Sequence, residues 1–163
     1  MIKKFVSTDV CLACNGCCRF SHIDSIWSVA LLDSDIKRLL RYSIPPAVIT
    51  RDKRIALEPT PKENNFACSF LNRDNNFCRV YKFRPWECQL YPFLVEKKGE
   101  KFFLAVDLNC PYAKAKLKTD EFKKYALYLR LLINKPRYLK ILRNNLHIFQ
   151  AYEGPELIAE IKL

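Results

Sequence analysis

The stretch Cys11-Leu12-Ala13-Cys14-Asn15-Gly16-Cys17-Cys18 places four of the 8 cysteines close to the start of the sequence. The other four follow far along the chain, at Cys68, Cys78, Cys88 and Cys110. The segment between Cys11 and Cys110 must fold back on itself if these thiols are to meet. We therefore predict that this part of the chain is organised around bound metal.

The surroundings of the cysteines favour metal over disulfide bonds. Met1 to Val6 is not followed by the apolar run of a signal peptide, so we expect a cytoplasmic protein. Leu127 to Ile133 is apolar but too short to span a bilayer, so we expect no membrane segment. In a reducing compartment, clustered cysteines bind metal or carry out redox chemistry more often than they form structural disulfides. Adjacent thiols such as Cys17 and Cys18 also rarely bridge each other.

The sequence is strongly basic, with a formal net charge of +11 at pH 7. Metal binding through thiolates would reduce this charge without reversing its sign. A basic surface favours an acidic partner, either an acidic protein or a redox partner, and nucleic acid is an alternative. A solvated lysine-rich surface without such a partner explains the same charge.

The order of apolar and turn residues predicts an α+β fold in one domain. Residues 1–115 are expected to form a small cysteine-rich, metal-centred region with short hairpins, packed against a helical C-terminal region, residues 116–163. Asn15-Gly16 is a turn dipeptide, so Cys11 to Cys18 is expected to be a loop. The thiols can converge on one point from such a loop.

Periodicity, turn residues and capping signals predict the remaining elements. A polar turn between Phe66–Leu71 and Phe77–Tyr81 predicts a hairpin that brings Cys68 near Cys78. Other strands are expected at Ile23–Leu32, Arg54–Glu58, Phe93–Glu96 and Phe102–Asp107. A helix capped by Asp33 is expected to bury Ile36, Leu39 and Leu40, and the expected helices are Ser34–Tyr42, Asp120–Asn134, Pro136–Phe149 and Pro155–Lys162.

The spacing of the first cysteines is typical of iron–sulfur proteins. Bacterial ferredoxins hold three irons of a cubane cluster with C-x2-C-x2-C and commonly take the fourth ligand from a remote Cys-Pro. Cys11, Cys14 and Cys17 have this spacing, and Cys110-Pro111 has the remote form. Zinc sites more often use two C-x2-C pairs. The count also fits two four-thiolate centres, one on Cys11, Cys14, Cys17 and Cys110 and one on Cys18, Cys68, Cys78 and Cys88, while one centre with spare thiols is an alternative.

Two motifs resemble those of a known family. They are Cys11-x2-Cys14-x2-Cys17-Cys18 and Cys78-Arg79-Val80-Tyr81-x2-Arg84-Pro85-x2-Cys88-x2-Tyr91-Pro92-Phe93. The chain resembles the CxxCxxCC proteins, which are described as zinc- or iron-chelating domains and often labelled iron–sulfur cluster-binding or oxidoreductase proteins. The resemblance implies chelation through all eight cysteines. A related cysteine-rich region in flagellin lysine N-methylases makes methyl transfer an alternative.

Three further residues are predicted to bind the cofactor. Arg79 and Arg84 can donate hydrogen bonds to thiolates or cluster sulfides and offset their negative charge. Tyr91 can shield a cluster from water. Surface ion pairs and aromatic core packing are the alternatives for these residues, and His22 is an alternative ligand in place of a thiolate.

The sequence therefore predicts a metal-binding protein that holds an iron–sulfur cluster, most simply 4Fe-4S, with a redox or substrate-binding role. One alternative is a structural zinc module that presents a basic surface to nucleic acid or an acidic protein. Another is a metal-dependent protein-modifying enzyme, such as a lysine N-methylase-like one. No catalytic residue can be named from the sequence.

Overall fold

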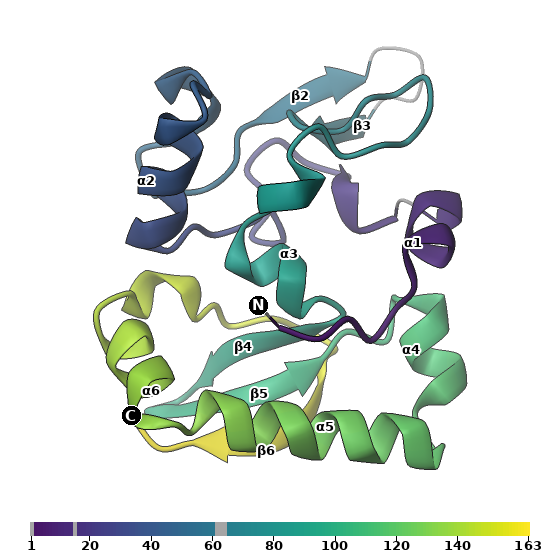
Figure 1. The fold of residues 1–163 in the computed structure, drawn as a ribbon, viewed down its shortest axis with the longest axis vertical. Helices are drawn as coiled ribbons and strands as arrows, with labels where there is room; N and C mark the ends of the chain where they lie inside the picture. Colours follow the sequence, from purple (N-terminus) through teal and green to yellow (C-terminus); the bar gives the residue numbers. More distant parts are fainter. Residues whose placement is uncertain (1, 15, 61–64) are drawn as a thin grey trace. The chain divides into compact units, whose positions relative to one another are not determined.

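The computed structural model describes residues 2–14, 16–60 and 65–163 and confirms the α+β fold (Figure 1). The chain divides into two compact units. The first unit comprises Ser7–Gln89, and the second comprises Ile2–Val6 together with Leu90–Leu163. Cys110 therefore belongs to the second unit and the other cysteines to the first. The predicted grouping of residues 1–115 and 116–163 within one domain stays a prediction.

The first unit contains a small antiparallel sheet in the order β1-β3-β2. Its strands are β1 (Arg19–Phe20), β2 (Leu57–Thr60) and β3 (Asn65–Cys68). β2 begins later than the predicted strand Arg54–Glu58 and continues beyond it through Pro59 to Thr60. β2 is an edge strand, and an edge tolerates the missing N–H of proline.

The helices of the first unit are α1 (Thr8–Cys14), α2 (Asp33–Arg41) and α3 (Trp86–Leu90), with short 3-10 turns η1 (Gly16–Cys18), η2 (Pro46–Val48) and η3 (Tyr81–Phe83). The loop predicted for Cys11–Cys18 is wrong, because α1 and η1 occupy most of it. Asp9 lies in the first turn of α1, where a negative charge favours a helix. Asn15 lies outside the described residues.

Helix α2 confirms the helix predicted at Ser34–Tyr42, but its cap and its inward face differ from the prediction. The N-cap is Leu32, and Asp33 is the first helical residue. Leu39 is fully buried, whereas Leu40 is 45% exposed. The residue that shares the inward face with Leu39 is Asp35, one turn earlier and 1% exposed. The core of this unit is a cluster of Leu31, Leu39, Ile55, Phe70 and Val80.

One predicted strand of the first unit is wrong, whereas the predicted polar turn closes as expected. Ile23–Leu32 is not a strand but a series of turns, in which only Ala30 forms an isolated bridge, with Arg54. In the polar turn, Asn72 N–H donates to the Phe77 carbonyl at 2.8 Å. This closure pairs Cys78 with Leu71, and Cys68, three residues earlier, lies within electrostatic reach of Cys78, as predicted.

The second unit contains an antiparallel sheet in the order β4-β5-β6. β4 (Phe93–Lys98) and β5 (Lys101–Val106) confirm the predicted hairpin, and Gly99 supplies the positive φ of its turn. β6 (Glu156–Ile161) corrects the helix predicted at Pro155–Lys162. Pairing of β6 with β5 provides hydrogen bonds that override the weak helix propensity of so short a segment.

The helices of the second unit are α4 (Pro111–Lys116), α5 (Asp120–Ile133) and α6 (Pro136–Arg143), followed by the 3-10 turn η4 (Leu146–Ile148). α5 confirms the prediction. α6 ends at Arg143, well before the predicted Phe149. The side chain of Asn145 donates to the Ile141 carbonyl at 2.8 Å, and asparagine competes with a helix in this way.

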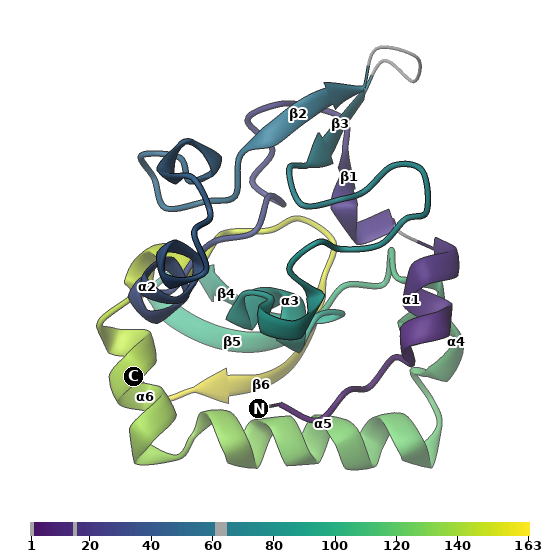
Figure 2. The same ribbon diagram turned by 45° about the horizontal axis from the view of Figure 1, so that its top comes forward.

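The N-terminal stretch Ile2–Val6 packs within the second unit beside α5 (Figure 2). The Phe5 ring meets those of Phe93 and Phe122 edge to face, at centroid distances of 5.6 and 5.7 Å. These aromatic contacts fix the stretch on the core of the unit. In the part of the chain that the structure covers, no helix has the length and apolar character needed to cross a membrane.

Candidate metal centre

None of the eight cysteines forms a disulfide bond. Cys11 and Cys14 lie one turn apart on α1, so they share a helix face. Cys17 and Cys18 lie on η1, and Cys68 ends β3. Cys78 follows the polar turn, and Cys88 lies at the centre of α3. The thiols of the first unit are therefore carried by separate elements, and each element fixes the direction of its own thiols.

Four of these thiols interact electrostatically in every pairwise combination. Burial raises the pKa of the Cys88 thiol, and negative charge on Cys68, Cys78 or Cys17 raises it further. Burial likewise raises the pKa of Cys68 to about 12 and that of Cys78 above its ordinary value. Cys17 acts on both, and its own pKa is raised first by a hydrogen bond with the Cys18 thiol. We refer to Cys17, Cys68, Cys78 and Cys88 as the four-thiol group.

Within residues 2–14, 16–60 and 65–163, no three Cys, His, Asp or Glu side chains already stand at metal-coordination geometry around one point. The donor chemistry nevertheless fits zinc or iron, because four thiols near one another are the ligand set that tetrahedral zinc and iron–sulfur clusters take. Binding would have to draw the sulfur atoms closer together and remove their protons.

The other cysteines are placed differently. Cys14 is exposed, and its Sγ lies 3.5 Å from the position that a Cβ on Gly16 would take. Cys18 is beside the four-thiol group through its hydrogen bond with Cys17. Cys110 is buried in the second unit, where it precedes Pro111 at the start of α4. The metal-binding role of these cysteines, like that of the four-thiol group, stays a prediction.

Two predicted arginines lie within electrostatic reach of the four-thiol group. The positive charge of Arg84 opposes the rise in the pKa of Cys17 and of Cys78, and that of Arg79 acts on Cys78. The Arg84 guanidinium lies over the Tyr81 ring, 4.8 Å from its centroid. Arg79 also donates to the Ser69 carbonyl at 2.7 Å. Both can therefore offset thiolate charge.

Two other predicted residues have different surroundings. The Tyr91 hydroxyl, in the second unit, donates to the Asp107 carboxylate at 2.9 Å. That bond gives Tyr91 a structural contact of its own, and its role at a cofactor stays a prediction. His22 is exposed to solvent.

The sequence did not reveal the ion pair that holds the start of α3. The Asp35 carboxylate accepts hydrogen bonds from the backbone N–H groups of Leu32 and Trp86, at 3.2 and 3.0 Å, and pairs with Arg38. Burial raises the pKa of Asp35, and these donors oppose the shift. The signal in the sequence was Asp35, one helical turn before Leu39 and so on the face expected to be buried. A charged side chain is seldom buried unless it is paired, so this position indicated a partner for Asp35.

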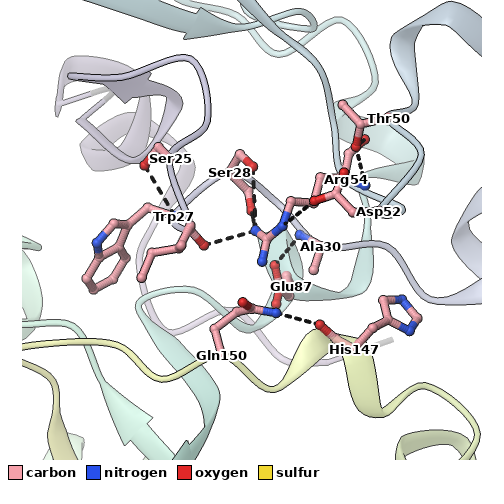
Figure 3. Close-up of polar contacts among 11 residues, drawn as sticks. Ser25, Trp27, Ser28, Ala30, Thr50, Asp52, Arg54, Glu87, His147 and Gln150 are labelled. Carbon is pink, nitrogen blue, oxygen red and sulfur yellow. Dashed lines mark hydrogen bonds and ion pairs between the residues drawn. The ribbon is translucent and has the colours of Figure 1, made fainter.

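A second anchor holds α3 through Glu87 (Figure 3). Its carboxylate accepts a hydrogen bond from Ala30 N–H at 2.7 Å and lies near the Arg54 guanidinium. Burial raises the pKa of Glu87 to about 8, against the opposing effects of Ala30 and Arg54. Arg54 is held in turn by the Ile26 and Ser28 carbonyls and by Asp52. The helix that carries Cys88 is therefore tied to the core at two points.

Comparison with known proteins agrees with the positions of the cysteines. No curated protein and no solved structure matches the chain. A family model described as "Putative zinc- or iron-chelating domain" matches residues 10–111, a stretch that contains all eight cysteines. The match covers more than half of the sequence, so the chain belongs to the CxxCxxCC family of zinc- or iron-chelating domains.

Proposed function

We propose that this protein holds an iron–sulfur cluster on cysteine thiolates and uses it for electron transfer or to bind a substrate. The observation that carries the proposal is the four-thiol group. It joins Cys17, from the N-terminal motif, to Cys68, Cys78 and Cys88, which are distant in sequence. A bound cluster would supply a site that accepts and releases one electron.

The chain's own residues contribute the ligands and the surrounding charge. The four-thiol group supplies four thiolates, as many as one cluster takes. Arg84 and Arg79 stand where they can compensate the negative charge of the loaded site. Iron–sulfur proteins commonly have the spacing of Cys11, Cys14 and Cys17, and of these three cysteines Cys17 belongs to the four-thiol group, whereas Cys11 and Cys14 lie outside it. The net charge of +11 supports an acidic protein as the redox partner.

Anaerobic purification tests the proposal directly. The expected product is brown, contains iron and inorganic sulfide, absorbs at roughly 400 nm and gives an electron paramagnetic resonance signal after reduction. Replacing Cys68 or Cys88 by serine is expected to abolish the absorption, and Cys14→Ser is the control at an exposed thiol. A colourless protein with stoichiometric zinc from iron-replete cells would overturn the cluster and leave a structural zinc site.

A further inference from the structure

The segment from Phe83 to Cys88 joins η3 to α3 and carries both Arg84 and Cys88. Three residues of this segment, Phe83, Arg84 and Trp86, form hydrogen bonds with side chains of α2. Arg38 donates from Nε to the Phe83 carbonyl at 3.2 Å and from Nη2 to the Arg84 carbonyl at 3.1 Å. Asp35 accepts from Trp86 N–H at 3.0 Å, skipping only Pro85, which has no N–H to donate.

The two side chains form one unit. The Asp35 side chain is 2% exposed and that of Arg38 is 34% exposed. The two carboxylate oxygens of Asp35 accept hydrogen bonds from Arg38, Leu32 N–H and Trp86 N–H. Little of their capacity to accept hydrogen bonds from water remains. Arg38 donates from two nitrogen atoms, Nε and Nη2, to separate acceptors, whereas lysine has a single donor nitrogen.

An aromatic contact between the same helix and the same segment supports the arrangement. Tyr42, at the C-terminal end of α2, stacks on Phe83 with ring centroids 4.1 Å apart. Gln89 also donates to the Arg84 carbonyl, at 2.9 Å. The backbone just before Cys88 is therefore fixed by polar bonds and by stacking, and the direction of the Cys88 thiol depends on that backbone.

We propose that the Asp35–Arg38 pair positions Cys88 and Arg84 for metal binding, so that α2 sets the geometry of the thiolate site without touching the metal. This inference rests on the proposed function, because it assigns positioning residues to the same site. Ligand geometry at a metal depends on such supporting groups, and their loss typically costs 10- to 100-fold in metal affinity.

The test compares Arg38→Lys with Arg41→Lys in the full chain loaded with Co²⁺. Arg38→Lys keeps the charge opposite Asp35 but loses the forked donation to two carbonyls. Arg41→Lys is the matched control, the same substitution at an exposed position on the same helix. The measurements are the Co²⁺ absorption spectrum, which reports thiolate number and geometry, the rate of Co²⁺ transfer to a chelator, and the melting temperature of the metal-free protein.

Arg38→Lys is expected to release Co²⁺ about tenfold faster and to change the spectrum, while Arg41→Lys matches the wild type. If Arg38→Lys lowers only the melting temperature and keeps the wild-type spectrum and release rate, the pair serves the fold alone and the inference is overturned. A wild-type protein that takes up no Co²⁺ on its thiolates would instead remove the proposed metal site itself, together with the inference.

Discussion

Proton release on metal binding provides the sharpest test of the four-thiol group. Burial and mutual repulsion raise the pKa of Cys68, Cys78 and Cys88, that of Cys68 to about 12, and a hydrogen bond with Cys18 raises the pKa of Cys17, so these thiols are protonated in the metal-free protein at pH 7. Metals bind the thiolate. Each ligand must therefore lose its proton, and we expect the first metal ion to release close to four protons.

The sign and size of the pH dependence follow from this count. Below its pKa, each thiol ligand makes the metal affinity rise up to tenfold per pH unit, or about 1.4 kcal/mol. Four such ligands give an increase of up to about 10⁴-fold per pH unit. Affinity should therefore rise steeply with pH between about 6 and 8 and should show no plateau there, because the raised pKa values lie above this range.

Zinc titration of the reduced, metal-free protein measures the proton count. Calorimetry in two buffers of different ionisation enthalpy gives the number of protons released per ion. Cys68→Ser should reduce that number by one and weaken binding, whereas Cys14→Ser should leave the first equivalent unchanged. Release of two protons or fewer by the wild type, or equal losses in the two variants, would refute the assignment of these four thiols.

Three further predictions use matched pairs or a single cap. In urea unfolding, Leu39→Ala should destabilise the protein by roughly 2–5 kcal/mol because it leaves a cavity in the core. Leu40→Ala should destabilise it by less than about 0.5 kcal/mol because that side chain is 45% exposed. Equal losses of stability would contradict the difference in burial. Thr119→Ala should cost about 1 kcal/mol by removing the N-cap of α5, and an unchanged unfolding midpoint would count against the cap. Arg84→Gln should weaken metal binding about tenfold, whereas Lys82→Gln, at an exposed position nearby, should leave the affinity unchanged. If both variants weakened binding equally, the effect would come from the overall charge and not from the position of Arg84.

The sequence predicts local structure where the pattern is long or has a clear turn. The helix at Asp120–Ile133 has four buried side chains at helical spacing, and the β4–β5 hairpin has glycine where the turn requires a positive φ. β6 was misread because six residues cannot fix their own conformation. Pairing with β5 makes this segment a strand, and a single sequence does not show which strand lies beside it.

The candidate site was predictable as a set of residue types but not as an arrangement. The cysteines were all named, whereas the grouping of Cys17 with Cys68, Cys78 and Cys88 depends on how separate elements meet. One of the two arrangements considered from the sequence combined Cys18 with Cys68, Cys78 and Cys88. In the structure Cys17 has the electrostatic contacts with these three, and the division of the ligands stays a prediction. Adjacent residues point in different directions, so only the conformation of η1 can distinguish them.

The packing of the first unit bears on whether metal is needed for its fold. Cys68 and Cys78 pack against the cluster formed by Leu31, Leu39, Ile55, Phe70 and Val80, each at most 5% exposed. Burial of each such side chain contributes about 2 kcal/mol, whereas small zinc fingers lack a comparable core and unfold without their ion. The core therefore brings two of the thiols near each other before any ion arrives, and the pair of Asp35 and Arg38 does the same for Cys88. On this reasoning, metal binding draws together ligands that the fold has already collected, and the energy of binding goes mainly into removing four protons and closing the last gaps between sulfur atoms.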